Sequence, residues 1–170
     1  MKHTATKTAF MGICVALAMI FSYVEVLLPP LFAAVPGIKL GLANVVVLFL
    51  LYRLGAWRAA AVSLVRVLLV SLLFGNALWL LYSAAGALCS LGVMLLLKKS
   101  GLFSEVGVSV SGAVAHNAGQ ILVALWLLGV AEIGYYLIVL AITGCVFGVA
   151  VGLLGAVAAR RIPRLPFERE

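Results

Sequence analysis

The sequence contains no aspartate, and its five acidic residues are all glutamates. Enzymes that condense prenyl diphosphates hold Mg²⁺ on aspartate-rich motifs, because carboxylates must bridge the ions to the diphosphate. Motifs of that kind cannot exist in this chain.

Other signatures of catalysis are missing as well. The chain has no G-x-x-x-x-G-K-[ST] loop, so we do not expect it to hydrolyse ATP. It also lacks an H-E-x-x-H pair, a nucleophile elbow and a G-x-G-x-x-G fingerprint. We therefore predict that the protein is not an enzyme, and we expect no catalytic residues, metal site or cofactor.

Charged residues are scarce. They make up 10% of the chain, whereas hydrophobic residues make up 66% and the mean hydropathy is +1.28. A soluble domain is about half apolar and about one quarter charged, so a lipid-exposed surface explains this excess best. The composition predicts an all-α integral membrane protein, and the length predicts a single transmembrane domain over residues 1–170.

The three cysteines are Cys14, Cys89 and Cys145, and each lies inside an apolar segment. Their wide separation fits neither a metal site nor an obvious disulfide framework. We expect three buried, inert thiols.

Six apolar runs approach the length of about 20 residues that a spanning helix needs. The predicted helices cover residues 8–28, 39–54, 57–74, 77–97, 103–128 and 133–160. The second is short for a full span. The proline-containing segment 31–38 before it could enter the membrane as a re-entrant or interfacial piece.

Lys and Arg predict the orientation, because they are enriched in cytoplasmic loops. With the N-terminus inside, the cytoplasmic side receives Lys2, Lys7, Arg53, Arg58, Lys98, Lys99, Arg160, Arg161, Arg164 and Arg169. The outer side receives only Lys39, and Arg66 lies within a span. We therefore predict a protein of the cytoplasmic membrane with both termini in the cytoplasm. The net charge of +7 then reflects topology rather than a nucleic-acid partner.

Small residues recur at four-residue spacing in two predicted helices, where they would let helix backbones approach closely in lipid. Gly144, Gly148 and Gly152 form one stripe, for which packing within the chain is the simpler interpretation. Thr8, Gly12 and Ala16 form the other, and this stripe could instead face another protein.

Arg66 is the most informative polar residue, because it lies near the centre of the third predicted helix. A central arginine costs about 2.5–3.5 kcal/mol even on the lenient insertion scale. It must therefore face the protein interior or a wet cavity. It could pair structurally with carbonyls or a carboxylate, or it could belong to a substrate site or gate.

His116, Asn117 and Gln120 form a second polar cluster on one arc of the fifth predicted helix. They could act as an interhelical hydrogen-bond clamp, with contacts worth about 0.6 kcal/mol each. Three adjacent hydrogen-bonding side chains are more than a clamp needs, and they favour a polar pocket.

Further candidates lie toward the predicted outer side: Glu25, Lys39, Asn44, Asn76, Trp79, Tyr82 and Tyr135. Glu25 and Lys39 could simply be solvated, whereas Asn44 is expected about one turn into an apolar helix. Binding sites for small molecules are mostly apolar with a few convergent polar groups. We therefore predict a substrate cavity that opens outward and has aromatic walls.

Two motifs carry a resemblance to a known family, namely residues 36–44 (PGIKLGLAN) and residues 112–120 (GAVAHNAGQ), together with Arg66. With them, the whole chain resembles the Gx transporter family, often labelled "heptaprenyl diphosphate synthase component I". That family belongs with the substrate-binding S components of energy-coupling factor (ECF) transporters. The synthase label conflicts with the missing aspartates.

The resemblance implies a six-helix S-component bundle that captures a vitamin-like small molecule from outside. It also implies a transmembrane coupling protein and two cytoplasmic ATPases as partners, whose ATP hydrolysis drives translocation. In such proteins a small-residue stripe on the first helix docks the coupling protein. Thr8, Gly12 and Ala16 hold the comparable places here.

The resemblance favours a flavin or a quinone-related precursor as the substrate. Lys39, Arg66 and His116 would suit an anionic or carbonyl-bearing ligand, and Tyr82, Trp79 or Tyr135 could stack on a flat ring. Two other functions stay open. The chain could be a non-catalytic membrane subunit of a prenyl diphosphate or quinone pathway enzyme, or a membrane accessory protein whose polar residues only join helices.

Overall fold

The computed structural model describes residues 2–27, 41–129 and 134–163, and these residues contain helices and no strand. The helices are α1 (Lys2–Leu27), α2 (Asn44–Arg53), α3 (Ala56–Phe74), α4 (Ala77–Ser100), α5 (Glu105–Leu128) and α6 (Tyr136–Arg161). The all-α prediction is therefore confirmed for the described part of the chain.

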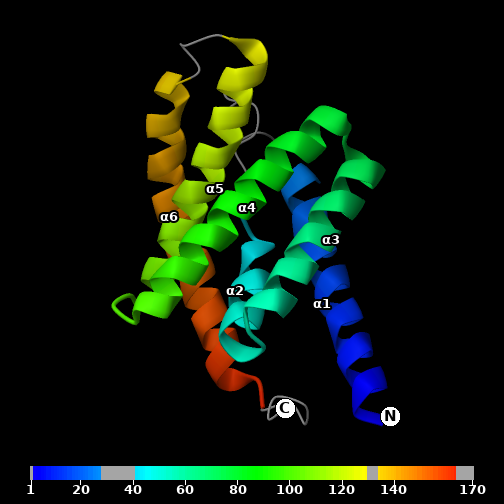
Figure 1. Cartoon of the computed structure of the whole chain (residues 1–170). Helices are drawn as coiled ribbons and strands as arrows, with labels where there is room; N and C mark the ends of the chain where they lie inside the picture. The colour runs from blue at the N-terminus through cyan, green and yellow to red at the C-terminus, as the bar shows by residue number, and fades with distance from the viewer. Residues whose placement is uncertain (1, 28–40, 130–133, 164–170) are drawn as a thin grey trace.

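The helices form one bundle in which α1 begins and α6 ends at the same end of the molecule (Figure 1). Five of them, α1, α3, α4, α5 and α6, are long and apolar enough to cross a membrane. The sixth, α2, has only 10 residues. At a rise of 1.5 Å per residue it covers about 15 Å, half of a hydrocarbon core of about 30 Å.

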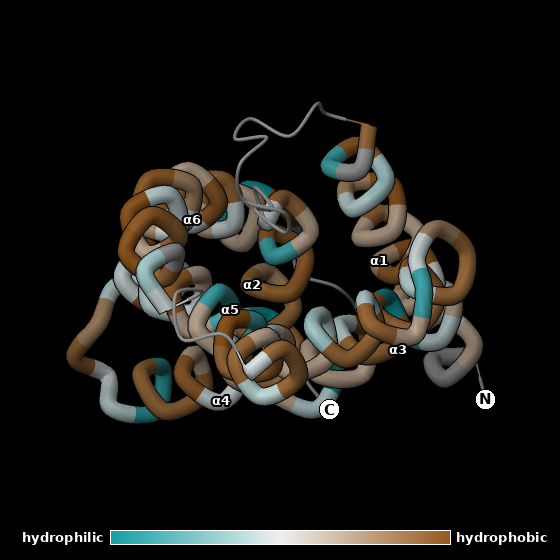
Figure 2. Tube along the Cα trace, turned by 90° about the horizontal axis from the view of Figure 1, so that it is seen from above, coloured by the Kyte–Doolittle hydropathy of each residue, from teal (hydrophilic) through white to brown (hydrophobic). Residues whose placement is uncertain are grey.

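Helix α2 is the centre of the bundle. It contacts α1, α3, α5 and α6, and it lies between these helices when the molecule is viewed from above (Figure 2). Six consecutive residues, 46–51, are buried, and Leu48, Leu50 and Leu51 are at most 1% exposed. A helix that is apolar on every side must be buried in a protein core or in a membrane, and α2 is buried mainly by the neighbouring helices.

The start of α2 differs from the prediction. The helix begins at Asn44 rather than at residue 39, because Gly41 takes a left-handed conformation with φ 72° and residues 42–43 form a turn. Asn44 is therefore the first residue of the helix and does not lie one turn inside it. The predicted re-entrant segment 31–38 lies outside the described residues.

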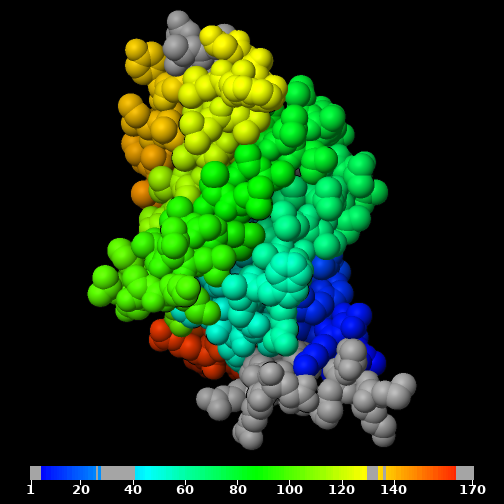
Figure 3. Space-filling model, in the orientation of Figure 1, coloured from blue at the N-terminus to red at the C-terminus, as the bar shows by residue number. Residues whose placement is uncertain are grey.

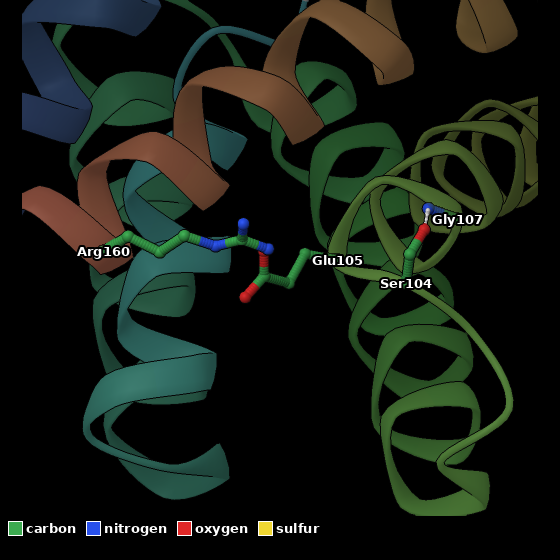
Figure 4. Close-up of polar contacts among 4 residues, drawn as sticks. All are labelled: Ser104, Glu105, Gly107 and Arg160. Atoms are coloured by element: carbon green, nitrogen blue, oxygen red, sulfur yellow. Dashed lines mark hydrogen bonds and ion pairs between the residues drawn. The ribbon is translucent and has the colours of Figure 1, made fainter.

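The other boundaries agree with the prediction to within a few residues at most ends. Helix α1 begins six residues earlier than expected, and α4 continues to Ser100. Helix α5 begins at Glu105 rather than at Phe103, because the Ser104 hydroxyl accepts a hydrogen bond from Gly107 N at 3.2 Å and caps the helix (Figure 4). A short 3₁₀ turn at residues 134–135 precedes α6.

The glycine stripe on α6 packs against α5, as expected for packing within the chain. A Cβ added at Gly144 would lie 3.0 Å from Asn117 Nδ2, and one at Gly148 would lie 2.7 Å from Val110 Cα. At Gly152 the nearest atom would be Val106 Cα, at 2.9 Å. The α5 backbone is therefore too close for a side chain at Gly148 or Gly152, whereas Gly144 is in tight contact with the Asn117 side chain.

The cysteine prediction is partly wrong. Cys14 is buried at 4% exposure, whereas Cys89 and Cys145 are exposed on the bundle surface. Cysteine behaves as a small hydrophobe, so a position on the apolar surface of a membrane protein suits it as well as a core position does.

The α5–α6 packing makes a prediction about stability. Gly148→Ala is expected to destabilise the protein by about 1–3 kcal/mol, because the added Cβ would press on α5 backbone, which can yield only if the helices separate. Gly92→Ala is the matched control, since nothing lies within 4 Å of its Cβ position. Thermal unfolding in detergent would measure both variants. Equal midpoints for the two would contradict the packing.

Candidate functional site

A cavity opens beyond the N-terminal end of α2, and all six helices line it. The space between its walls is about 710 Å³ when the solvent at its open mouth is included, and about 40 Å³ of it can hold the centre of a water molecule. Its lining consists of Ser22, Glu25, Gly41, Asn44, Arg66, Val67, Val70, Ser71, Trp79, Ser83, Ala113, His116, Asn117, Gly144 and Phe147. Small-molecule sites have this mixture of apolar and polar groups.

The lengths of α2 and α3 place Arg66 at the floor of this cavity. The two helices contact each other and are joined only by Leu54 and Gly55. At 1.5 Å per residue, Asn44 lies about 14 Å from the end of α2, and Arg66 lies about 15 Å from the beginning of α3. Arg66 is therefore level with the first residue of α2, where the short helix stops filling the bundle.

Arg66 is buried but incompletely hydrogen-bonded. It is 8% exposed, and its Nη1 donates to Ser22 Oγ at 3.2 Å. Within the described residues its Nε is buried without a hydrogen-bond partner. The other charged group on the described cavity wall is Glu25, whose Oε1 accepts a hydrogen bond from Leu42 N.

His116 and Asn117 reach the cavity from α5 and contact different neighbours. The His116 ring lies over Gly86 of α4, where an added Cβ would be 2.9 Å from two ring atoms. Asn117 Nδ2 donates to the Leu140 carbonyl of α6 at 2.7 Å. Asn117 therefore makes the interhelical contact expected of a clamp while it also lines the cavity.

The remaining predicted binding residues that the structure describes are not among those that line the cavity. Asn76 caps α4, with its Oδ1 accepting from Trp79 N at 2.9 Å. Tyr82 and Gln120 are half-buried away from the lining, and Tyr135 is 75% exposed. Lys39 lies outside the described residues. The cavity thus brings together Asn44, Arg66, His116 and Asn117 from the predicted set.

Sequence reasoning missed several wall residues, chiefly the hydroxyls of Ser22, Ser71 and Ser83. Serine is ordinary in membrane helices, so its presence alone is no signal. Ser22 could have been found from its position four residues after Ala18, which itself follows Cys14 by four residues. These three are the buried residues of α1, so they lie on the face that packs inward. This face of α1 therefore turns polar where it meets the cavity.

The small-residue stripe on α1 is exposed, unlike the stripe on α6. Thr8, Gly12 and Ala16 are all exposed, and nothing lies within 4 Å of a Cβ added at Gly12. The stripe lies on the opposite side of the helix from the buried residues Cys14 and Ala18. In the space-filling view α1 lies at the edge of the bundle (Figure 3).

The polar contacts near the ends of α5 and α6 are of a different kind. Arg160 Nη2 lies 3.0 Å from Glu105 Oε2 in an ion pair on the surface (Figure 4). Arg53 Nη1 donates to the carbonyls of Ala159 and Ile162 at 2.6 and 2.8 Å and so caps the end of α6. Surface ion pairs contribute about 0–1 kcal/mol. The Arg160–Glu105 pair also lines an open surface pocket of about 190 Å³ between the ends of α5 and α6.

The hydrogen bond of Asn117 predicts that Asn117 and Gln120, both on α5, contribute differently to the stability of the protein. Asn117→Ala is expected to lower the free energy of unfolding by about 0.6–1.7 kcal/mol, because it removes a buried interhelical hydrogen bond. Gln120→Ala is the control and should change it by less, since Gln120 is only half-buried. Unfolding by denaturing detergent would measure both. An equal loss for the two variants would refute the clamp.

A family model described as heptaprenyl diphosphate synthase component I matches residues 14–158, which include every lining residue of the cavity. Comparison with curated proteins and with solved structures finds no match. The matched region is most of the 170-residue chain. The protein therefore belongs to the heptaprenyl diphosphate synthase component I family.

Proposed function

We propose that the protein is the substrate-binding S component of an energy-coupling factor transporter. The observation that carries the proposal is the buried arginine at the floor of a cavity with mixed polar and apolar walls in the bundle. A charge at membrane depth is expensive, and such residues mark substrate pathways. The ligand would be a vitamin-like molecule, with a flavin or a quinone-related precursor favoured.

The absence of catalytic and nucleotide-binding motifs in the sequence agrees with a passive binder. The chain has no P-loop with which to bind ATP, so uptake would need energy from elsewhere. A transmembrane coupling protein and two cytoplasmic ATPases would supply it.

The proposal includes a six-span topology with both termini in the cytoplasm. Two observations support it: the bias of Lys and Arg toward one side, and the position of the start of α1 and the end of α6 at the same end of the bundle (Figure 1). Helix α2 would then complete its crossing together with the segment that precedes it. The cavity, lined by the far end of α1, would open to the outside.

Single cysteines in a cysteine-free background would test this topology. Ala77→Cys at the start of α4 and Leu102→Cys after its end both replace exposed residues. A membrane-impermeant maleimide should label position 77 in intact cells and position 102 only after permeabilisation. The reverse pattern would invert the topology, and labelling of both from outside would exclude α4 as a span.

The exposed stripe on α1 is the proposed docking face for the coupling protein. Without small side chains, helix backbones cannot come close in lipid, where no hydrophobic drive brings them together. The α6 stripe is already occupied by α5, whereas Thr8, Gly12 and Ala16 remain exposed.

Ala16→Leu is therefore expected to reduce co-purification with the coupling protein and ATPases at least tenfold, because the added bulk would hold the helices apart. Ala150→Leu makes the same change at an exposed alanine of α6 and should leave recovery unchanged. The assay is co-expression with the coupling module of the same cell and purification through a tagged ATPase. Equal recovery of the two variants would exclude the α1 stripe as the docking face.

A second candidate function is supported by the family's description, which names a component of a prenyl diphosphate synthase. In that case the chain would be a non-catalytic membrane subunit, and Arg66 and His116 would contact a diphosphate. The test is whether membranes containing the protein raise the activity of a soluble prenyltransferase partner. A rise that Arg66→Ala abolishes would favour this function over transport.

A further inference from the structure

We propose that an anionic phospholipid binds in the surface pocket between the ends of α5 and α6, with its phosphate at Arg160 and part of an acyl chain on the apolar wall of the pocket. The pocket shares no lining residue with the cavity at Arg66, so this inference is separate from the proposed transport function. Three features of the pocket support it: its apolar wall, its depth in the bilayer, and the positive charge at its mouth.

The first feature is the apolar wall of the pocket. About 190 Å³ of the pocket can hold the centre of a water molecule, against about 40 Å³ in the cavity at Arg66. The apolar wall consists of Val106 of α5 and of Leu153, Ala156 and Val157 of α6. Ala156 is 9% exposed and forms the floor, whereas Leu153 and Val157 are more than half exposed and border it. An apolar cavity of about 150 Å³ can bind a molecule such as benzene, so this pocket has room for part of an acyl chain.

The second feature is the depth of the pocket in the bilayer. Both helices are long and apolar enough to cross a membrane, and Glu105 begins α5 while Arg160 lies in the last turn of α6. Leu153 lies about 10 Å from Arg160 along α6, at 1.5 Å per residue. The hydrocarbon core of one leaflet is about 15 Å thick. With Arg160 at the level of the lipid head groups, Leu153 therefore lies beside the acyl chains, so the polar and apolar parts of the pocket follow the order of a phospholipid.

The third feature is the positive charge at the mouth of the pocket. Arg160 Nη2 lies 3.0 Å from Glu105 Oε2, and the two side chains reach toward one another between the helices (Figure 4). The Arg160 side chain is nonetheless 77% exposed, so a second acceptor can reach it. Further cations lie in the last turns of α2, α4 and α6, namely Arg53, Lys98, Lys99 and Arg161. In the described part of the chain, this end of the bundle therefore carries a net positive charge.

An anionic phospholipid matches this charge. Arginine binds phosphate through two parallel N–H bonds, and basic pockets between membrane helices on the cytoplasmic side bind anionic lipid head groups. Glu105 would compete with the phosphate, since both accept hydrogen bonds from the Arg160 guanidinium. The site therefore predicts opposite effects for the two partners of the ion pair. Loss of Arg160 should weaken lipid binding, and neutralisation of Glu105 should strengthen it.

Lipid retention by the unsubstituted chain is the first test. The protein is purified in detergent, dioleoyl phosphatidylglycerol and dioleoyl phosphatidylcholine are added in equal amounts, and native mass spectrometry counts each lipid on the protein. The two lipids have the same chains and differ in the charge of the head group. We expect phosphatidylglycerol to be retained about fivefold or more over phosphatidylcholine, because one nearby Lys or Arg strengthens the attraction of an anionic lipid about fivefold.

Substitutions at the ion pair locate the head group. Arg160→Ala is expected to lower the affinity for phosphatidylglycerol about ten- to hundredfold, because it removes charge-assisted hydrogen bonds. Arg161→Ala is the matched control, since it removes the same charge from the next exposed residue, which does not line the pocket. Its effect should be about fivefold at most. Glu105→Gln should raise the affinity, because it removes the charge that competes for Arg160.

Ala156→Leu locates the acyl chain, because the larger side chain would fill the floor of the pocket. It is expected to lower the affinity for phosphatidylglycerol about tenfold, which corresponds to the loss of about two buried methylene groups. Ala150→Leu makes the same change at an exposed alanine of α6 outside the pocket and should leave the affinity unchanged.

Three results would overturn the proposal. Equal retention of the two lipids would mean that the pocket does not select an anionic head group. Equal losses for Arg160→Ala and Arg161→Ala would assign the attraction to the general positive charge of this end. A loss of the same size for Arg160→Ala and Glu105→Gln would leave the ion pair with a structural role alone.

A protein partner is the competing occupant of the pocket. If Ala156→Leu lowered recovery of the coupling module and left phosphatidylglycerol binding unchanged, the pocket would belong to that partner and the lipid would be excluded. The comparison of the two lipids needs no substitution, and Arg160 and Arg161 are both exposed. The proposal is therefore decided even if Ala156→Leu fails to fold.

Discussion

The length and burial of α2 are the constraint on which the rest of the bundle depends. This helix is apolar on every side and contacts four of the five other helices, so it organises the core. It is also only 10 residues long and fills about half the thickness of a bilayer. The same element therefore closes one half of the bundle and leaves the other half to be lined by side chains of its neighbours.

The position of Arg66 follows from this constraint. The cost of a charge near the membrane centre falls when protein and polar groups surround it. Because α3 follows α2 after a tight turn, Arg66 reaches the level at which α2 begins, and Ser22 and Glu25 of α1 complete that region. Val62, one turn before Arg66 in α3, is 1% exposed and belongs to the apolar core. An arginine there would lack both the cavity and its polar neighbours.

The number of helices and most of their bounds could be predicted from sequence, because the length of each apolar run and the positions of the charged residues between the runs determine where such helices begin and end. Arg66, His116 and Asn117 were identifiable as cavity residues because polar groups at depth must face inward. The start of α2 could not be predicted, since nothing in the apolar run showed that Gly41 would adopt a positive φ. Tyr82 and Gln120 failed to reach the lining because their direction depends on how α4 and α5 rotate against their neighbours. That rotation is set by close contacts at Gly86 and Gly119, which periodicity does not encode.

Helix α1 connects the two functional proposals physically. Its C-terminal half places Ser22 and Glu25 on the cavity wall, and its N-terminal half carries the exposed stripe of Thr8, Gly12 and Ala16. Ala16 and Ser22 are six residues apart, or about 9 Å along a rigid helix. The helix contacts only α2 and α3 within the described bundle, so it is the least constrained of the spans. A partner that moved α1 would therefore move the hydroxyl that holds Arg66, and binding at the cavity would respond to docking without any other helix having to shift.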